Sequence, residues 1–456
     1  MIAPARVAAY EALSAVSAGN ADLPTAIASA RDSLRDDRDR ALAADIAAGV
    51  QRWRAALDHL IVQFAKRSLD RLDFEVVEIL RMSAYQMLYL TRVPASAVVD
   101  DAVDLTRRAG KQSASGFVNA VLREISRRRN QPPLPPRPAD PSHRDAALDY
   151  LSVTLSHPRW LAARWYDRLG FGAADAWMRF NNTAAPVTLR VNRFKTTPQN
   201  LVDRLDRDDV RVRPARFAPD ALIVEEGYPL RTASFNEGAF VVQDEASQLV
   251  GWLASASPGR RVLDTCASPG GKATAIAATM EGRGLLVACD VRARRVDLLR
   301  RTVATAGAPN VRIVQADLLS PLPFSQPFDT VLVDVPCSGL GTLRRDPDIR
   351  WRRRDADLRS FAAAELTMLK HAADAVAPGG RLIYATCSSE PEENEAVVDA
   401  FLASDRGAGA FAPVDARAAA PSLPPALVDE HGRLRTSPDR HELEAFFAAV
   451  FELRHL

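Results

Sequence analysis

The spacing of apolar residues over the first 130 residues is that of helices. Apolar side chains recur every three or four positions, as in Val77, Leu80, Ala84 and Leu88, so that they line one face of a helix. Short breaks at Gly or Pro separate one such segment from the next. Residues 1–130 are therefore predicted to form an all-helical domain.

The pattern changes after a proline-rich stretch. Residues 131–141 hold six prolines in eleven residues, a composition typical of an extended, semi-rigid linker. In residues 142–237 the alternation of apolar and polar side chains at Val187–Asn192 and Ala221–Val224 predicts strands among helical segments. We expect a small α+β module there, with its tryptophans in the core rather than stacked on bases.

From residue 238 to residue 456, short apolar runs alternate with amphipathic segments. The intervening segments Val291–Val303 and Leu358–Ala375 have helical spacing, and alternating strands and helices are typical of a doubly wound parallel sheet. The predicted strands are Val262–Leu263, Leu285–Cys289, Val311–Val314, Val331–Val333, Arg381–Tyr384 after a Gly379–Gly380 turn, and the late run Phe446–Phe451. The predicted fold is multidomain: all-α, then α+β, then α/β Rossmann-like.

Composition and charge exclude several classes of protein. The chain is 47% hydrophobic and 25% charged, with a net charge of +2 and no apolar run long enough to span a bilayer. Four cysteines without a CxxC pair exclude a disulfide scaffold or a zinc site. We expect a cytoplasmic monomer with free thiols that binds neither a membrane nor a metal.

Three of the predicted strands end in loops that carry chemically useful residues. These loops are Cys266–Lys272, Asp334–Ser338 and Thr386–Ser388. Ligands of open α/β sheets bind beyond the carboxyl ends of the strands. The three loops are therefore expected to converge on one edge of the sheet.

The first loop and two later acids indicate a nucleotide-like cofactor. The Pro269–Gly271 turn lets backbone approach a ligand, and Asp290 follows Gly270 by 20 residues, where an acid binds ribose hydroxyls. Asp317 could receive an adenine edge. This pattern favours S-adenosylmethionine and another nucleotide about equally. The candidate cofactor-binding residues are Cys266, Ala267, Ser268, Pro269, Gly270, Gly271, Lys272, Asp290, Asp317 and Asp334.

The two other loops suit chemistry at C5 of a cytosine. C5 is a poor nucleophile, but a thiolate added at C6 makes it enamine-like, and Cys is intrinsically reactive enough for that addition. A carboxyl group at N3, for which Asp334 is the candidate, would stabilise the adduct. A second thiol near the first can assist its breakdown, and Cys337 and Cys387 are the two candidates.

Residues 238–456 resemble the RNA cytosine-5 methyltransferase family. The resemblance implies a class I methyltransferase domain that uses S-adenosylmethionine, with Cys387 as nucleophile and Cys337 as the aid to release. DNA cytosine-5 enzymes use the Pro-Cys cysteine and lack the other, so both together indicate RNA. Ser268, where the family usually has Ala, and the ending Leu443–Phe447 depart from the family pattern. The motifs that carry the resemblance are Val242–Ser247, Cys266–Lys272, Asp334–Ser338, Thr386–Ser388 and Pro391–Asn394.

The N-terminal part resembles a NusB-like RNA-binding domain. Val93–Val103 and Phe117–Arg123 carry this likeness. The order of parts is similar to that of the family members that methylate 16S ribosomal RNA, and the resemblance leaves open whether the substrate is naked RNA or a small-subunit particle. Arg344–Trp351 fits their RNA-facing loop. The alternatives are the same chemistry on transfer RNA or another ribosomal cytosine, and a non-catalytic RNA-binding or antitermination factor.

Overall fold

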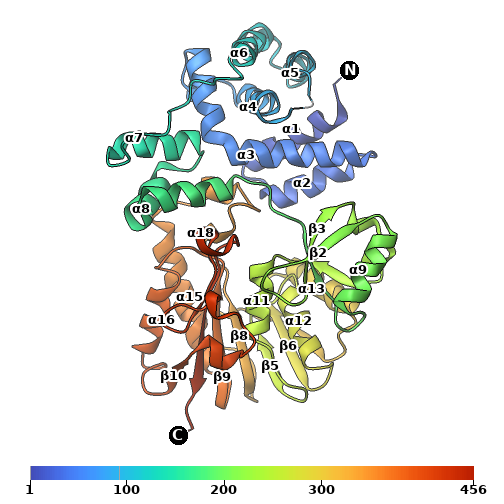
Figure 1. Ribbon diagram of the computed structural model, residues 1–456, viewed down its shortest axis with the longest axis vertical. Coiled ribbons are helices and arrows are strands. Elements are labelled where there is room, and N and C mark those ends of the chain that lie inside the picture. The colour runs from blue at the N-terminus through green and yellow to red at the C-terminus, as the bar shows by residue number, and fades with distance from the viewer. Residues whose placement is uncertain (1, 92, 456) are drawn as a thin grey trace. The chain divides into compact units, whose positions relative to one another are not determined.

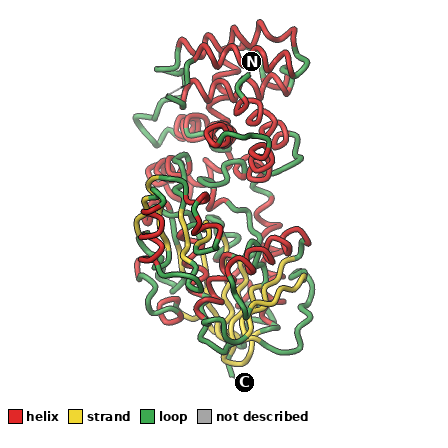
Figure 2. Tube along the Cα trace, turned by 90° about the vertical axis from the view of Figure 1, so that its right-hand side faces the viewer, coloured by secondary structure: helices red, strands yellow, loops and turns green. Residues whose placement is uncertain are grey.

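The computed structural model describes residues 2–91 and 93–455, which form two compact units (Figure 1). The first unit runs up to Ala184 and includes a second segment, Leu343–Asp355. The other consists of Ala185–Thr342 and the chain from Ala356 onward. Figure 2 shows the strands in the second unit, whereas the described part of the first is helical. The predicted all-helical start and later α/β domain are confirmed.

The first unit is a set of packed helices with an apolar core. Trp165 is fully buried in α8, as predicted for a core residue. This helix has a kink at Gly170, whose φ is +77°. The helices are α1 (Pro4–Ser17), α2 (Leu23–Asp32), α3 (Asp37–Ala65), α4 (Phe74–Tyr89), α5 (Ala95–Arg108), α6 (Ser115–Arg127), α7 (Arg144–Asp149) and α8 (Arg159–Asn181).

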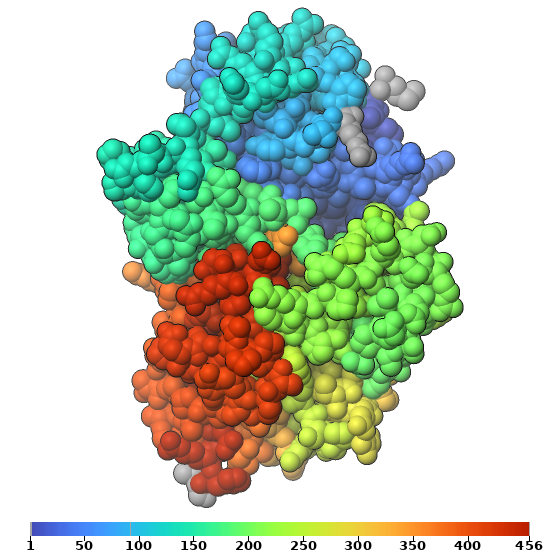
Figure 3. Space-filling model, viewed as in Figure 1, coloured from blue at the N-terminus to red at the C-terminus, as the bar shows by residue number. Residues whose placement is uncertain are grey.

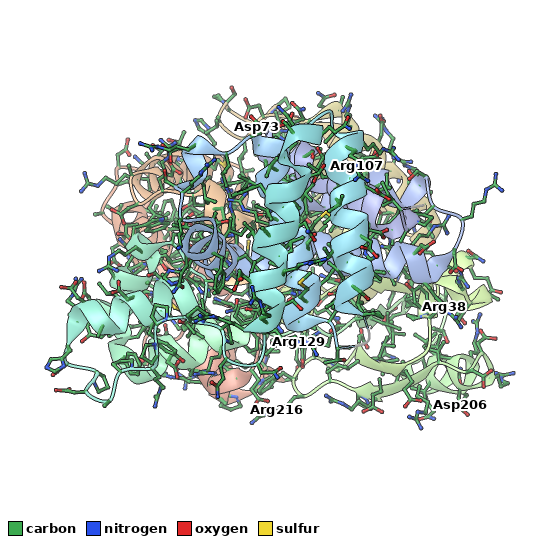
Figure 4. The ribbon with its side chains drawn as sticks, turned by 90° about the horizontal axis from the view of Figure 1, so that it is seen from above. Arg38, Asp73, Arg107, Arg129, Asp206 and Arg216 are labelled. Atoms are coloured by element: carbon green, nitrogen blue, oxygen red, sulfur yellow. The ribbon has the colours of Figure 1, made fainter. Side chains whose placement is uncertain are left out.

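Helices α5 and α6 lie side by side and antiparallel, as Figure 4 shows from above. The labelled Arg107 lies in the last turn of α5, and Arg129 lies just beyond the end of α6, at the opposite end of the pair. Arg107 is 56% exposed and pairs with Asp104 at 2.9 Å. Exposed pairs of this kind are weak, so Arg107 remains available to a polyanion.

The segment Leu343–Asp355 corrects one expectation from the sequence. Arg350 is fully buried in the first unit, where its Nη1 donates to the carbonyl of Ser156 and to Asn182 Oδ1, both at 2.9 Å. Trp351 Nε1 donates to the carbonyl of Gln51 at 2.6 Å. Burial lowers the pKa of Arg350 to about 9. The expectation that these two side chains face RNA is wrong, because their polar atoms are used inside the protein.

The second unit begins with a four-stranded antiparallel sheet in the order β2-β3-β1-β4. The predicted strands near residues 187 and 221 are confirmed as β1 (Thr188–Val191) and β3 (Ala221–Glu226), and α9 (Pro198–Arg207) packs beside them. β2 (Arg211–Pro214) was not predicted, although Val210–Arg213 alternates apolar and polar residues, because the run is short and ends at a proline. β4 (Phe240–Val242) pairs with β1.

The larger sheet has eight strands, seven of them in the order β10-β12-β9-β8-β5-β6-β7, with β11 beside β12. β5 to β9 run parallel, as predicted, and β12 and β10 add antiparallel neighbours. The predicted Gly379–Gly380 turn lies instead inside β9, where a register shift against β8 accommodates it. The strands are β5 (Arg261–Asp264), β6 (Leu285–Asp290), β7 (Val311–Gln315), β8 (Phe328–Asp334), β9 (Val376–Thr386), β10 (Phe411–Val414), β11 (Leu434–Arg435) and β12 (Phe447–Leu453).

The order of the strands places a topological switch point between β5 and β8. The chain moves outward from β5 through β6 to β7 and then returns to the other side of β5, which is where open α/β sheets bind ligands. Figure 3 shows green and red surface side by side in this unit. The rings of Phe217 and His441 lie with their centroids 6.1 Å apart. The main helices are α11 (Glu245–Leu253), α12 (Gly271–Thr279), α13 (Ala293–Ala306), α15 (Asp357–Ala373) and α16 (Glu395–Leu402). In the described residues, no helix is both long and apolar enough to cross a membrane.

Candidate active site

The two cysteine loops follow neighbouring parallel strands. Asp334, the last residue of β8, pairs with Ala385 near the end of β9. Beyond the strands, the amide of Val335 donates to the carbonyl of Ala385, and the amide of Gly341 donates to that of Cys387, each at 3.0 Å. The two loops therefore leave the sheet together.

The two thiols lie in direct contact. Cys337 Sγ and Cys387 Sγ are 3.2 Å apart, and the amide of Cys387 lies 3.3 Å from Cys337 Sγ. Both cysteines are half-buried. The hydrogen bond with Cys387, together with burial, raises the pKa of the Cys337 thiol well above its usual range. Cys337 therefore keeps its proton, because two thiolates cannot share this contact.

A glycine makes this close approach of the loops possible. A Cβ on Gly341 would lie 2.1 Å from the carbonyl oxygen of Ala445 and 2.7 Å from that of Cys387. Both neighbours are backbone atoms and have little room to move. Only glycine fits at this position, so any side chain at residue 341 would displace the Cys387 loop.

Asp334 is held by a lysine from the cofactor loop. Lys272 Nζ lies 2.7 Å from Asp334 Oδ2, and the two side chains are 13% and 23% exposed. Burial lowers the pKa of Lys272, but the charge and hydrogen bond of Asp334, together with the charges of Asp244 and Asp264, raise it overall. The two side chains form a charge-assisted pair. An ionised carboxylate here can accept a hydrogen bond from a substrate.

The loop Cys266–Lys272 turns tightly into α12. Gly270 has φ +108°, and a Cβ there would lie 2.9 Å from Leu299 Cδ1, so the turn requires glycine. The amide of Ala267 donates to the carbonyl of Cys289, and the amide of Gly270 donates to that of Ala267, both at 2.7 Å. The first amides of α12 follow directly and favour a negatively charged group.

Two buried carboxylates beside this loop have few or no hydrogen-bond donors from the described residues. Neither oxygen of Asp264, the last residue of β5, has a hydrogen-bond partner among the described residues, although the side chain is buried. Burial and the nearby Asp334 raise the pKa of Asp264 to about 7. Asp290, at the end of β6, is also buried and accepts from the amide of Arg292 at 3.1 Å. Such acceptors fit a ligand with ammonium or hydroxyl donors.

Asp264 was missed by the sequence reasoning. It follows Val262–Leu263 and precedes the glycine loop, so an acid at a strand end was the available signal. Its lack of donors becomes visible only once the strands are placed.

The other candidate residues lie on the same edge in different surroundings. Asp317 is exposed, two residues beyond β7, and its Oδ1 accepts from the amide of Leu319 at 2.9 Å. Ser268 Oγ donates to the carbonyl of Arg295 at 3.1 Å. Burial raises the pKa of the Cys266 thiol well above its usual range, which makes that thiol inert. The structure thus brings Cys337 and Cys387 into contact and places Asp334 at the end of β8, three residues before Cys337, whereas Asp317 lies beyond the outermost parallel strand.

Comparison with known proteins places this site in a family. Residues 252–452 match the family model described as 16S rRNA methyltransferase RsmB/F. Residues 3–127 match the NusB family, and residues 157–231 match the ferredoxin-like domain of RsmF/B-like methyltransferases. Ribosomal RNA small subunit methyltransferase B of Pseudomonas putida is 33% identical over 410 residues, which cover 88% of this chain and 90% of that protein. The chain belongs to the RsmB/F methyltransferase family.

Further relatives support this RsmB/F assignment over the whole length. Ribosomal RNA small subunit methyltransferase B of Pseudomonas syringae is 32% identical over 439 residues, covering 94% of this chain and 92% of that protein. The solved structure of PH0851 superposes with a TM-score of 0.81 at 25% identity and covers 99% of both chains. A methyltransferase homologue from Pyrococcus horikoshii has a TM-score of 0.58 at 26% identity, covering 68% of this chain and 99% of that one. The family resemblance predicted from the motifs is confirmed.

Proposed function

We propose that this chain transfers a methyl group from S-adenosylmethionine to C5 of a cytosine in 16S ribosomal RNA. The observation that carries the proposal is the contact of Cys337 and Cys387, at 3.2 Å, in the loops that follow the paired strands β8 and β9, with Asp334 at the end of β8. Membership in the RsmB/F family supports methyl transfer, and the names of its relatives support ribosomal RNA as substrate.

The cofactor would be held by the loop Cys266–Lys272 and the acids beside it. S-adenosylmethionine supplies an electrophilic methyl group when bound. The buried acceptors Asp264 and Asp290 fit its ammonium and ribose hydroxyl donors, since neither oxygen of Asp264 is otherwise satisfied among the described residues. Asp317 lies further along the same edge, where it could receive the adenine.

The two cysteines divide the work. The Cys387 thiolate adds to C6 of cytosine, the electron pair moves to C5, and C5 takes the methyl group. Solvent water then takes the C5 proton, the electron pair of the C5–H bond re-forms the C5=C6 double bond as the C6–S bond breaks, and the departing Cys387 thiolate is stabilised by the S–H of Cys337. Cys337 suits this second role because its raised pKa keeps it protonated.

Asp334 would orient the cytosine ring. Ionised beside Lys272, it accepts a hydrogen bond from the N3–H of the adduct, and Lys272, at 2.7 Å from the carboxylate, is the nearby proton source. This role requires the ion pair to open toward the substrate.

The parts outside the catalytic unit would recruit RNA. We retain residues 1–130 as an RNA-binding domain, residues 131–141 as a linker, residues 142–237 as the α+β module and residues 238–456 as the methyltransferase domain. The match to the NusB family supports the first assignment. We propose a cytoplasmic monomer. A purely non-catalytic factor is disfavoured, because it would not need two thiols in contact with each other.

Bisulfite sequencing tests the proposal. Ribosomal and transfer RNA would be compared between the wild-type strain, a deletion strain, and deletion strains complemented with the wild-type gene or with Cys387→Ala. One cytosine of 16S ribosomal RNA should lose methylation on deletion and regain it only with the wild-type gene. Loss at a transfer RNA or another ribosomal cytosine would support the alternative substrates. Unchanged methylation everywhere would contradict the proposal.

A further inference from the structure

One buried carboxylate contacts both cysteine loops. Glu393 lies just before α16 and is fully buried. Its Oε1 accepts from the amide of Ser338 at 2.6 Å, and its Oε2 accepts from Ser338 Oγ at 2.6 Å. Ser388 Oγ donates to the same Oε2, and the two serine hydroxyls are 3.2 Å apart. The carboxylate therefore links positions 50 residues apart in the chain.

The two serines have equivalent positions in their loops. Ser338 directly follows Cys337, and Ser388 directly follows Cys387. Both serines are buried. Because each serine is one residue from a reactive thiol, fixing the two hydroxyls on one carboxylate fixes the two Sγ atoms relative to each other.

Glu393 is itself fixed by neighbours in the second unit. Tyr384 O–H donates to the carbonyl of Glu393 at 2.6 Å and lies 3.1 Å from Glu365 Oε2. Asn394 Oδ1 accepts from Thr386 Oγ1 at 2.6 Å, and Asn394 Nδ2 donates to the carbonyl of Ser388 at 3.1 Å. Glu393 is thus fixed to β9, the strand that ends beside Cys387.

Because a buried carboxylate needs hydrogen-bond donors, the link through Glu393 depends on the position of both cysteine loops. Hydrogen bonds to an ionised acceptor are about twice as strong as neutral ones, and a buried carboxylate without donors is costly. Here the donors come from two loops, so the carboxylate is satisfied only when both loops are in place. A shift of either cysteine loop would remove at least one of its donors.

We propose that Glu393 is a positioning residue that holds Cys337 and Cys387 at the separation their reaction requires. The proposal rests on the proposed cytosine-5 chemistry for its functional part. Its geometric part, the thiol contact, stands without that chemistry. It assigns a role to the Pro391–Asn394 motif, which the mechanism otherwise leaves unused.

The test compares Glu393→Gln and Ser388→Ala with two matched controls. Glu390 is a second fully buried glutamate of the same loop and accepts from Ser389 Oγ at 2.8 Å. Glu390→Gln therefore controls for burying an amide in this loop, and Ser389→Ala controls for losing a neighbouring hydroxyl. An amide at residue 393 can accept from the Ser338 amide with its oxygen, but its NH₂ group can only donate to the two serine hydroxyls, so the charged acceptor that both hydroxyls share is lost.

Two measurements separate positioning from general stability. The first is kcat and KM for RNA and S-adenosylmethionine. The second is binding of phenylarsine oxide, which forms two As–S bonds to neighbouring thiols with release of water and therefore reports the thiol contact itself. Cys337→Ala should abolish the arsenical signal and thereby assigns it to this pair.

Glu393→Gln should lower kcat about a hundredfold, as expected for a misplacement on the order of 1 Å, with both KM values unchanged and arsenical binding weakened. Ser388→Ala should lower kcat roughly tenfold, in line with the loss of one charged hydrogen bond, and it carries the test should Glu393→Gln not fold. The controls should match the wild type.

Normal arsenical binding in Glu393→Gln, or an equal loss of kcat in Glu390→Gln, would overturn the proposal. A wild-type protein that binds the arsenical through this pair, with weakened binding in Glu393→Gln, but methylates no cytosine would instead refute the proposed function and leave the geometric part standing.

Discussion

The buried acids in the two halves of the catalytic sheet edge have opposite hydrogen-bond environments. In the cysteine half, the carboxylate of Glu393 accepts three hydrogen bonds from Ser338 and Ser388. In the cofactor half, the carboxylate of Asp264 accepts none from the described residues. Both side chains are buried, Asp264 at the carboxyl end of β5 and Glu393 in the loop after β9, and β8 lies between these two strands.

This difference separates positioning from binding. A buried acid whose partners belong to the protein holds the protein's own groups in place, and its contacts are complete before any ligand arrives. A buried acid without donors is costly to the free protein, and its cost is relieved by a ligand that brings donors. The same residue type thus has two functions, which its hydrogen-bond partners distinguish.

The largest expected effect concerns the cysteines themselves. Cys387→Ala should abolish methylation and form no adduct. Cys337→Ala should still attack and methylate, and then accumulate a covalent protein–RNA complex that survives denaturing gel electrophoresis, because the thiol that assists release is absent. A gel with radiolabelled RNA and both variants measures this. A trapped complex in Cys387→Ala would reverse the two roles.

The next effect is the pH dependence of the free protein. The pKa of Asp264 is about 7 in the fold and near 3.9 when unfolded, so the folded state binds the proton more tightly. Stability from this group is therefore full below about pH 4 and is lost as the pH rises to about 7, by up to about 4 kcal/mol. Denaturant unfolding of the wild type and Asp264→Asn at several pH values isolates the contribution of Asp264 to the free energy of unfolding. If the free energy of unfolding changed with pH in the same way for both proteins, the Asp264 carboxylate would have hydrogen-bond donors in the free protein.

Asp290→Ala should weaken S-adenosylmethionine binding by roughly ten- to a hundredfold, which corresponds to about 1.5–3 kcal/mol for a hydrogen bond to a charged group. The side chain is buried at the end of β6, where a ribose would bind. Calorimetry measures the affinity, and Asp297→Ala, which removes an exposed acid of α13, is the control. Equal affinities would remove Asp290 from the cofactor site.

The smallest effect should come from Asp317. Because this carboxylate is exposed and already accepts from the amide of Leu319 at 2.9 Å, Asp317→Ala should reduce cofactor affinity by less than about tenfold. The same calorimetric titration applies. A loss as large as that of Asp290→Ala would show that an acid with a protein donor can still bind the ligand strongly. Hydrogen-bond partners would then not distinguish acids that position the protein from acids that bind the ligand.

Much of the site could be predicted from the sequence because its signals are local. Cys337 and Cys387 each follow a short apolar run, and the Pro269–Gly271 turn precedes a helix, so strand ends and loops were recognisable within about ten residues. Parallel β/α alternation then implied that these loops share one edge. The same local reasoning missed β2, a short, largely exposed run that ends at a proline.

The sequence by itself determined the order of the three parts, the parallel core of the large sheet and the identity of the reactive loops, since periodicity and turn residues encode these. Only the tertiary structure decided which polar groups are satisfied. Ser338 meets Glu393 across 55 residues, and Arg350, expected to face RNA, donates to Ser156 across 194 residues. Burial and hydrogen-bond partners at such separations depend on how elements pack, and no local pattern specifies them.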